Sequence, residues 1–201
     1  MLHIRSYFFR HSSLTYSDRL SYNYVKNKEV FGTKKMRLFI AVKFSEELKK
    51  ELIRQINSLK EQSEHGNFTK AENLHLTLAF IGESMRINDI KKIMDGISEE
   101  CFNICLNGSG RFGSLYWIGL KKEPGLFRLA KYLREELDKN GIPVDKKQFS
   151  PHITIAREVT AKTAVDLQVK QTEMHVEKIS LMRSDRINGK LVYTEVYAKN
   201  L

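Results

Sequence analysis

Long apolar runs are absent from this 201-residue chain. A membrane-spanning helix needs roughly 18 consecutive apolar residues, whereas the most apolar stretch, residues 74–82, already contains His75 and Thr77. Residues 1–35 lack the uninterrupted apolar core that a secretory signal requires, because polar residues divide it. The sequence therefore predicts neither a membrane span nor a secretory signal, and we expect a cytoplasmic protein.

Cysteine is also scarce, since the chain contains only Cys101 and Cys105. Two cysteines are too few for a disulfide framework, and their spacing suits neither a metal knuckle nor a redox C-x-x-C pair. We interpret both residues as buried core thiols.

Acidic residues are outnumbered by basic ones. The 34 Lys and Arg against 24 Asp and Glu give a net charge of +10, which favours a polyanionic partner such as RNA. Half of that charge lies in residues 1–35, where seven basic and two acidic residues leave +5. The charge therefore says less about the folded part of the chain than the total suggests.

Residues 1–35 are rich in Ser, Tyr and Arg and precede a second methionine, Met36, which leads directly into a strand pattern. We interpret this segment as a dispensable extension or the product of an upstream start codon. A transit peptide and a nucleic-acid-binding tail are the alternatives. Residues 36–201 are then expected to form a single domain.

Strand and helix patterns alternate from Met36 onward. Strand patterns cover residues 37–42, 74–81, 102–106, 115–120, 150–156, 174–183 and 191–198. Apolar residues at helical spacing predict helices over residues 46–60, 87–97 and 126–137. Ser45 caps the first helix, Asn140-Gly141 closes the third, and Asn188-Gly189 joins the last two strands. This mixture predicts an α+β fold rather than a doubly wound parallel sheet.

The segment Gly108-Ser-Gly110-Arg-Phe-Gly113 matches the G-x-G-x-x-G pattern of dinucleotide-binding loops. That fingerprint requires a helix immediately after the last glycine. A strand pattern beginning at Leu115 follows instead, so we interpret the glycines as a loop between two strands.

The most informative feature is a repeated motif. The sequences His75-Leu-Thr77-Leu-Ala and His152-Ile-Thr154-Ile-Ala share the pattern H-h-T-h-A, in which h is aliphatic. Residues i and i+2 of a strand share a face, so each His and its Thr point the same way while the aliphatic residues point into the core. Two corresponding strands would then present two imidazoles and two hydroxyls to one site.

Two imidazoles suit acid–base chemistry at phosphorus. Their unperturbed pKa lies near neutral pH, so one ring can accept a proton while the other donates one. The hydroxyls of Thr77 and Thr154 can donate hydrogen bonds to non-bridging phosphoryl oxygens. A metal site is disfavoured, because threonine is a poor ligand and no carboxylate stands at ligand spacing within either motif. We interpret His65, in an expected loop at residues 64–66, and His175 as structural or surface residues, because neither has a threonine two positions later.

Two H-x-T-x tetrapeptides 77 residues apart resemble the signature of the 2H phosphoesterase superfamily. The wider pattern resembles its RNA 2′,3′-cyclic phosphodiesterase branch, also called 2′-5′ RNA ligase or LigT/ThpR-like. The similar stretches lie at residues 36–42, 72–83, 149–157 and 181–184. Residues 1–35 lie outside the resemblance.

The resemblance implies a bilobal α+β fold with pseudo-two-fold symmetry, in which antiparallel sheets line a central cleft and helices lie outside. It implies no metal and no cofactor, and RNA ends with a 2′,3′-cyclic phosphate as substrate, with tRNA fragments and short oligonucleotides as candidates for a monomeric enzyme. By this analogy His75 donates a proton and His152 accepts one, although the residues alone leave the two roles interchangeable. Ligation through a 2′-5′ linkage at the same site, and a non-catalytic module that binds RNA ends, remain alternatives.

The fifth residue after each histidine differs between the two motifs, being Phe80 in the first and Arg157 in the second. An aromatic ring can stack on a base and a guanidinium can pair with phosphate, so both are candidate substrate-binding residues. Their odd spacing places them on the opposite face of an ideal strand, so a role in the site requires a bulge or bend. The alternative is edge packing for Phe80 and a surface charge for Arg157.

Overall fold

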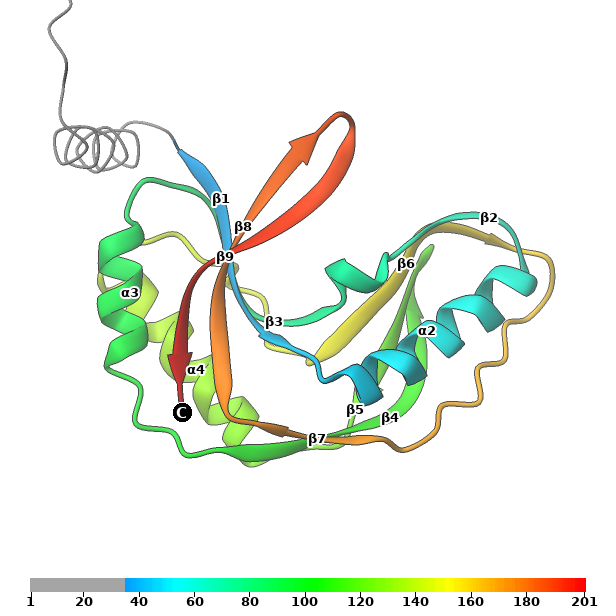
Figure 1. Ribbon diagram of the computed structural model, residues 1–201, viewed down its shortest axis with the longest axis horizontal. Helices are drawn as coiled ribbons and strands as arrows, with labels where there is room; N and C mark the ends of the chain where they lie inside the picture. Colours follow the sequence, from blue (N-terminus) through cyan, green and yellow to red (C-terminus); the bar gives the residue numbers. More distant parts are fainter. Residues whose placement is uncertain (1–34) are drawn as a thin grey trace, which may run out of the picture. The chain divides into compact units, whose positions relative to one another are not determined.

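The computed structural model describes residues 35–201 (Figure 1). Except for Lys35, the expected N-terminal extension lies outside these residues. The described helices are α2 (Glu46–Glu61), α3 (Ile87–Asp95), α4 (Pro124–Lys139) and the 3-10 helix η1 (Ala71–Asn73). The strands are β1 (Met36–Lys43), β2 (Ser63–Phe68), β3 (His75–Ser84), β4 (Phe102–Phe112), β5 (Leu115–Leu120), β6 (His152–Ala161), β7 (Glu173–Val176), β8 (Lys178–Ile187) and β9 (Lys190–Asn200).

The strands form two antiparallel sheets. One has the order β3-β1-β8-β9 and the other the order β2-β6-β5-β4-β7. In each sheet a motif strand pairs with the strand that precedes a long helix, since β3 pairs with β1 before α2 and β6 pairs with β5 before α4. This repeat of strand, helix and motif strand, in two sheets, confirms the predicted α+β class.

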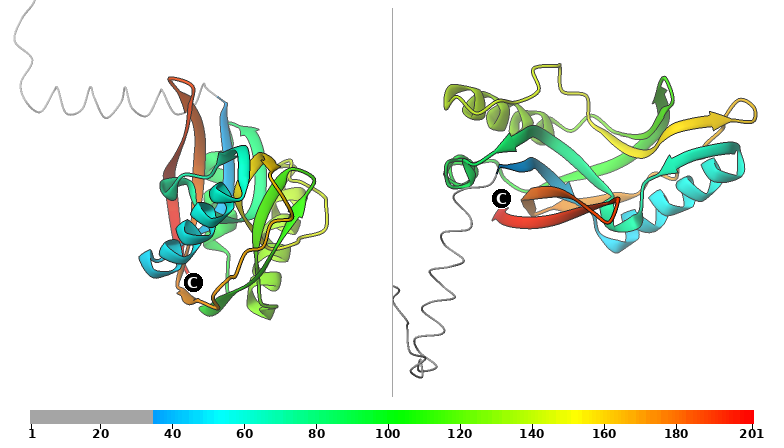
Figure 2. Two further views of the ribbon diagram at one scale, coloured as in Figure 1. Left: turned by 90° about the vertical axis from the view of Figure 1, so that its right-hand side faces the viewer. Right: turned by 90° about the horizontal axis from the view of Figure 1, so that it is seen from above.

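The helices cross between the two halves. Helix α2 follows a strand of the four-stranded sheet but packs against β2 and β6, whereas α4 follows a strand of the five-stranded sheet but packs against β3 as well as β4. Figure 2 shows α2 and α4 on opposite sides of the described part of the chain. Each half therefore supplies the helix that covers a motif strand of the other half.

The ends of these helices follow the predicted capping chemistry. The Ser45 side chain accepts a hydrogen bond from the Leu48 amide at the start of α2. Helix α4 ends with Asn140 at its C-cap and with Gly141 at a φ of +66°, a conformation that favours glycine. Both predicted ends are confirmed.

One apolar core connects the sheets and the helices. It includes aliphatic residues of both motif strands and the inward faces of all three α-helices. Leu76, Leu78, Ile153 and Ile155 are all buried, as the alternation in the two motifs predicts. The faces of β3 and β6 that carry the histidines are therefore turned away from this core.

The predicted strand over residues 174–183 is wrong as a single element. The chain breaks at Glu177, with β7 in the five-stranded sheet and β8 in the four-stranded sheet. Val176 and Ile179 are both fully buried, so the apolar pattern continues while the chain changes sheets. The sequence pattern records burial and does not reveal which sheet provides it.

The glycine segment is also mostly strand rather than loop. Strand β4 continues to Phe112, and only Gly113 and Ser114 form the turn into β5. Gly108 has a φ of +68° and lies within a register shift against β5, which lets the strand continue past a local irregularity. The absence of a helix after Gly113 is as predicted.

Two smaller predictions are wrong. Glu64-His65-Gly66 lies in strand β2 rather than a loop, because β6 supplies a pairing partner that is distant in sequence. Cys101 is exposed just before β4, whereas Cys105 is buried as predicted. Cys101 precedes the point where the strand begins to pack, so the core does not cover it.

No helix among residues 35–201 is both long and apolar enough to cross a membrane.

Candidate active site

The two histidine motifs occupy equivalent positions. His75 is the first residue of β3 and His152 is the first residue of β6. Each histidine and the threonine two residues later are half-buried, because the aliphatic residues between them take the core side. Strands β3 and β6 come from different sheets and contact each other. The fold thus brings the two motifs together from opposite halves of the described chain.

Main-chain hydrogen bonds link each motif strand to the segment that precedes the other motif. The Thr69 amide donates to the Ile155 carbonyl at 2.8 Å, and the Asp145 amide donates to the Phe80 carbonyl at 3.2 Å. Thr69 also donates its hydroxyl hydrogen to the Thr154 carbonyl at 3.0 Å. These reciprocal bonds fix the position of the two motifs relative to each other.

A main-chain carbonyl orients each imidazole. His75 Nδ1 lies 2.7 Å from the Asn73 carbonyl oxygen, and His152 Nδ1 lies 2.8 Å from the Ser150 carbonyl oxygen. A carbonyl only accepts hydrogen bonds, so each Nδ1 carries a hydrogen and donates it. In the neutral ring Nε2 is therefore the basic nitrogen. Both histidines are prepared in the same way to take up or give a proton at Nε2.

The Thr77 hydroxyl is placed next to the reactive nitrogen of the first motif. Thr77 Oγ1 lies 3.0 Å from His75 Nε2. The hydroxyl donates to the neutral ring and accepts from the protonated ring, because it has both a hydrogen and lone pairs. Thr77 can therefore keep its hydrogen bond to His75 in both protonation states of the ring.

Aromatic rings support both histidines. The His75 ring centroid lies 4.8 Å from that of Phe39 and 5.2 Å from that of Tyr193, the latter in an edge-on arrangement. Phe39 comes from β1 and Tyr193 from β9. On the other side, the His152 ring centroid lies 5.5 Å from that of Phe112 and 6.5 Å from that of Trp117. Each imidazole is held by its carbonyl bond and by two rings.

Sequence reasoning missed these four aromatic residues. They lie on strands that are separated from the motifs along the chain, and only the pairing of the strands brings them close. Their sequence neighbourhoods contain no repeat comparable to the histidine motifs. Nothing in the sequence alone distinguishes them from ordinary core aromatics.

Electrostatics distinguish His75 from an exposed histidine. Burial of the ring lowers the pKa of His75, the Asn73 carbonyl acts in the opposite direction, and positive charge on Arg157 and His152 lowers it further. Burial raises the pKa of Tyr193, and Arg157 is the first of the charges that reduce this effect. The charge of Arg157 therefore acts on the surroundings of His75, although Arg157 belongs to the second motif.

A β-bulge changes the direction of Phe80. Adjacent residues of β1 pair with residues of β3 that are two positions apart, namely Ile40 with Ala79 and Ala41 with Thr77. Leu78 is therefore an extra residue in β3, and it lies next to another buried residue instead of an exposed one. The bulge places Phe80, which is 39% exposed, on the same face as His75 and Thr77. The Arg37 guanidinium lies 5.0 Å from the Phe80 ring centroid.

The second motif strand contains an equivalent β-bulge. Adjacent residues of β5 pair with residues of β6 that are two positions apart, namely Tyr116 with Ala156 and Trp117 with Thr154. Ile155 is the extra residue, and it too is followed by a buried alanine. The exposed Arg157 therefore lies on the face of His152 and Thr154. Both positions that required a bulge to face the site have one.

The other two histidines among residues 35–201, His65 and His175, lie away from the two motifs. His65 Nε2 is 3.0 Å from Thr160 Oγ1, and His175 Nδ1 is 2.6 Å from Asn103 Oδ1. The structure brings together His75, Thr77, His152, Thr154 and Arg157, and leaves His65 and His175 in side-chain contacts of their own.

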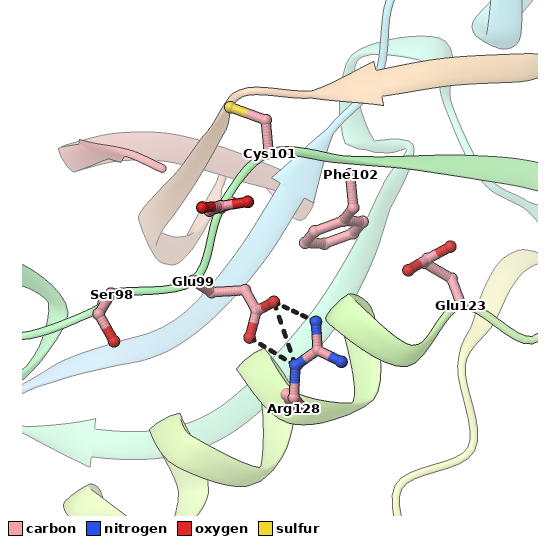
Figure 3. Close-up of a pocket in the computed structure, with 7 residues that line it drawn as sticks. Ser98, Glu99, Cys101, Phe102, Glu123 and Arg128 are labelled. Atoms are coloured by element: carbon pink, nitrogen blue, oxygen red, sulfur yellow. Dashed lines mark hydrogen bonds and ion pairs between the residues drawn. The ribbon is translucent and has the colours of Figure 1, made fainter.

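A surface pocket of about 440 Å³ lies at another place (Figure 3). It is lined by Ser98, Glu99, Glu100, Cys101, Phe102, Glu123 and Arg128. The carboxylate of Glu99 pairs with the Arg128 guanidinium across it. None of the motif residues lines this pocket. Among residues 35–201, no group of three or more His, Cys, Asp or Glu is arranged to hold a metal ion.

Comparisons with known proteins agree with this geometry. The family described as the 2′-5′ RNA ligase superfamily matches residues 45–188 of the chain. An RNA 2′,3′-cyclic phosphodiesterase of Thermotoga maritima is 29% identical in an alignment of 180 positions that covers 81% of this chain and 94% of the relative. A protein of the same name from Escherichia coli is 28% identical in an alignment of 163 positions that covers 79% of this chain and 92% of the relative.

Solved structures show the same fold. A crystal structure of E. coli LigT complexed with 3′-AMP matches with a TM-score of 0.71 and 27% identity, covering 84% of this chain and 99% of that protein. A crystal structure of a Thermus thermophilus protein matches with a TM-score of 0.75 and 28% identity, covering 83% of this chain and 98% of that protein.

Proposed function

Because this chain belongs to the 2′-5′ RNA ligase superfamily, we propose that it hydrolyses 2′,3′-cyclic phosphates at RNA ends to 2′-phosphomonoesters. The observation that carries the proposal is the equivalent preparation of two histidines. Both Nδ1 atoms are bound to main-chain carbonyls, and both motif strands meet in one place. The curated relatives that bear the name RNA 2′,3′-cyclic phosphodiesterase support it.

Hydrolysis divides into one proton uptake and one proton release. His152 Nε2 removes a proton from water while the water oxygen forms a bond to phosphorus. The bond between phosphorus and the 3′ oxygen breaks, and His75 Nε2 gives its proton to that oxygen. The product has a free 3′ hydroxyl and a 2′-phosphate. A proton has moved from His75 to His152, and exchange with solvent restores the starting state.

The remaining site residues hold the phosphate and the nucleotide. The hydroxyls of Thr77 and Thr154 donate hydrogen bonds to the non-bridging oxygens, where negative charge increases in the transition state. The Arg157 guanidinium attracts the same charge. Phe80 offers an exposed ring on the same face for contact with a base. No step in this scheme requires a metal ion or an organic cofactor.

The lowered pKa of His75 has two opposite consequences for a proton donor, since it strengthens the acid and reduces the fraction of the ring that is protonated in the free protein. Burial and neighbouring positive charge make its imidazolium a stronger acid, so the proton is more readily given to the departing oxygen. The negative charge of a bound cyclic phosphate acts in the opposite direction and favours the protonated ring before the reaction.

The position of the phosphate in the product tests the direction of cleavage. We expect a dinucleotide with a 2′,3′-cyclic phosphate to yield only the 2′-monophosphate, because the donor reaches one of the two leaving oxygens. Phosphorus NMR distinguishes the 2′ from the 3′ product. A 3′-phosphate would reverse the roles of His75 and His152, and an intact ring despite saturable RNA binding would replace hydrolysis by a binding function.

Ligation of RNA ends through a 2′-5′ linkage is the second candidate, and the description of the matching family favours it. It uses the same groups with a ribose hydroxyl in place of water. Incubation with an RNA that carries a free 5′ hydroxyl, followed by analysis of product length, separates the two reactions.

The natural substrate and setting belong to the same proposal. We propose that the enzyme acts as a monomer in the cytoplasm on tRNA fragments or short oligonucleotides. The basic charge of +10 supports an RNA partner. Comparing turnover of tRNA halves with that of dinucleotides, and measuring mass in solution, tests this part.

A further inference from the structure

The glycine-rich end of β4 builds an exposed aromatic surface beside His152. Phe112 stands at the tip of the β4–β5 hairpin and is 52% exposed. Its ring centroid lies 5.5 Å from that of His152, with the rings nearly perpendicular at 87°. Trp117 lies behind it, with ring centroids 5.3 Å apart. Much of the Phe112 ring is thus open to solvent directly next to His152, the residue proposed to accept the proton from water.

Glycines make this arrangement possible. A Cβ atom added to Gly110 would lie 2.3 Å from Trp117 Cζ2 and 2.5 Å from Trp117 Cη2. Both distances are shorter than the contacts that real Cβ atoms make. Only glycine at this position lets the indole lie against the backbone of β4. Gly113 has a φ of +59° in the turn that follows Phe112, a conformation that other residues rarely adopt. The segment that resembles a dinucleotide loop therefore serves to seat two aromatic rings.

The aromatic residues on the other side of the site differ in exposure. Phe39, which supports His75, is only 3% exposed. Tyr193 is partly buried and packs against Phe39 and His75. Both are less exposed than Phe112. The exposure of Phe112 is therefore not needed to hold an imidazole, because Phe39 does so while buried.

We propose that Phe112, backed by Trp117, stacks against the nucleobase of the nucleotide that carries the cyclic phosphate. The inference rests on the proposed function. The base and the 2′,3′-phosphate are attached to the same ribose, so a phosphate at His152 places the base within reach of a ring that contacts His152. Every base has a π-face, so this contact binds all four nucleotides without reading the sequence.

Binding of a product nucleotide gives the first test. Trp117 is the single tryptophan of the chain and packs against Phe112, so its fluorescence reports a ligand at this ring. We expect Phe112→Ala to weaken binding of adenosine 2′-monophosphate by roughly 5- to 150-fold, the range found for loss of one base stack. Binding of inorganic phosphate should weaken much less than binding of the nucleotide, because phosphate has no base to stack, and Phe112→Tyr should resemble the original protein.

Two further variants serve as controls. Ile187→Ala removes an equally exposed apolar side chain, 53% exposed at the tip of the β8–β9 hairpin, and should leave both affinities unchanged. Phe112→Leu keeps apolar bulk without a π-face and should weaken nucleotide binding while phosphate binding persists. Weaker binding of phosphate by Phe112→Ala to the same extent would show that Phe112 only supports His152, and unchanged nucleotide binding would also overturn the proposal.

Kinetics provide an independent test with two substrates, a dinucleotide 2′,3′-cyclic phosphate and the same compound with an abasic terminal ribose. We expect Phe112→Ala to raise KM for the first substrate by a larger factor than for the second, because a loss of support for His152 affects both substrates equally whereas a lost base stack affects only the first. Equal losses on both substrates would refute stacking. If the original protein hydrolyses neither substrate, the proposed function fails, while the fluorescence titration still decides whether Phe112 binds a base.

Discussion

The hydroxyl of Thr77 offers a way to separate folding from catalysis. Thr77→Val keeps the shape of the side chain and removes the oxygen that lies 3.0 Å from His75 Nε2. In the folded protein this deletes one hydrogen bond at a half-buried position, which lowers the free energy of unfolding by about 0.5–1.5 kcal/mol. In the transition state it deletes a donor to a phosphoryl oxygen, which costs about 2.7–4 kcal/mol, or 10²–10³ in kcat.

The chain contains a matched control for this substitution. Thr160 Oγ1 lies at the same distance, 3.0 Å, from His65 Nε2, on the strand pair β2–β6 but outside the site. Thr160 is exposed, so Thr160→Val should lower stability by no more than Thr77→Val does, and it should leave kcat unchanged. Thr77→Ser keeps the hydroxyl and should stay within about fivefold of the original rate.

Urea unfolding and steady-state hydrolysis of a dinucleotide 2′,3′-cyclic phosphate measure the two effects. The reasoning is refuted if Thr77→Val loses less than about threefold in kcat, or if Thr77→Ser is as slow as Thr77→Val. Equal rate losses for Thr77→Val and Thr160→Val would mean that the hydrogen bond acts through general stability.

Four more outcomes are expected. His75→Ala and His152→Ala should each lower kcat by roughly 10²–10⁴, whereas His65→Ala and His175→Ala should change it little; a motif variant within about threefold of the original rate would exclude two-histidine catalysis. The lowered pKa of His75 means that the unfolded chain binds the proton of this ring more tightly than the folded chain does. The stability from the neutral ring is therefore complete above about pH 6.5 and is lost as the pH falls toward the lower folded pKa. Urea unfolding should show a smaller loss of stability from pH 7 to pH 5 for His75→Gln than for the original protein, and parallel dependences of stability on pH for the two proteins would contradict this. Hydrolysis should persist in excess EDTA, and a loss restored by one divalent ion would remove the metal-free mechanism. A chain that begins at Met36 should fold and keep most of its turnover on short substrates, with weaker binding to long RNA because five net positive charges are gone; insolubility would place the first 35 residues in the fold.

The direction of Phe80 and Arg157 shows where sequence reasoning ends. Strand periodicity predicts the faces of His75 and Thr77 correctly, because two residues of regular strand always return to one side. The fifth residue reaches the same side only through the bulges at Leu78 and Ile155. A bulge depends on how two strands pair, so the residues of one strand do not define it.

The sequence by itself determined the repeated histidine motifs, the faces of their first three residues, the ends of the helices and the α+β class. These features depend on residues near one another along the chain, where periodicity and capping chemistry act. The tertiary structure alone decided that β7 and β8 lie in different sheets, that carbonyls orient both imidazoles, and that Phe39, Tyr193, Phe112 and Trp117 surround them. Those features arise because packing and strand pairing bring together residues that are far apart in sequence, and local patterns contain no information on which distant strands will meet.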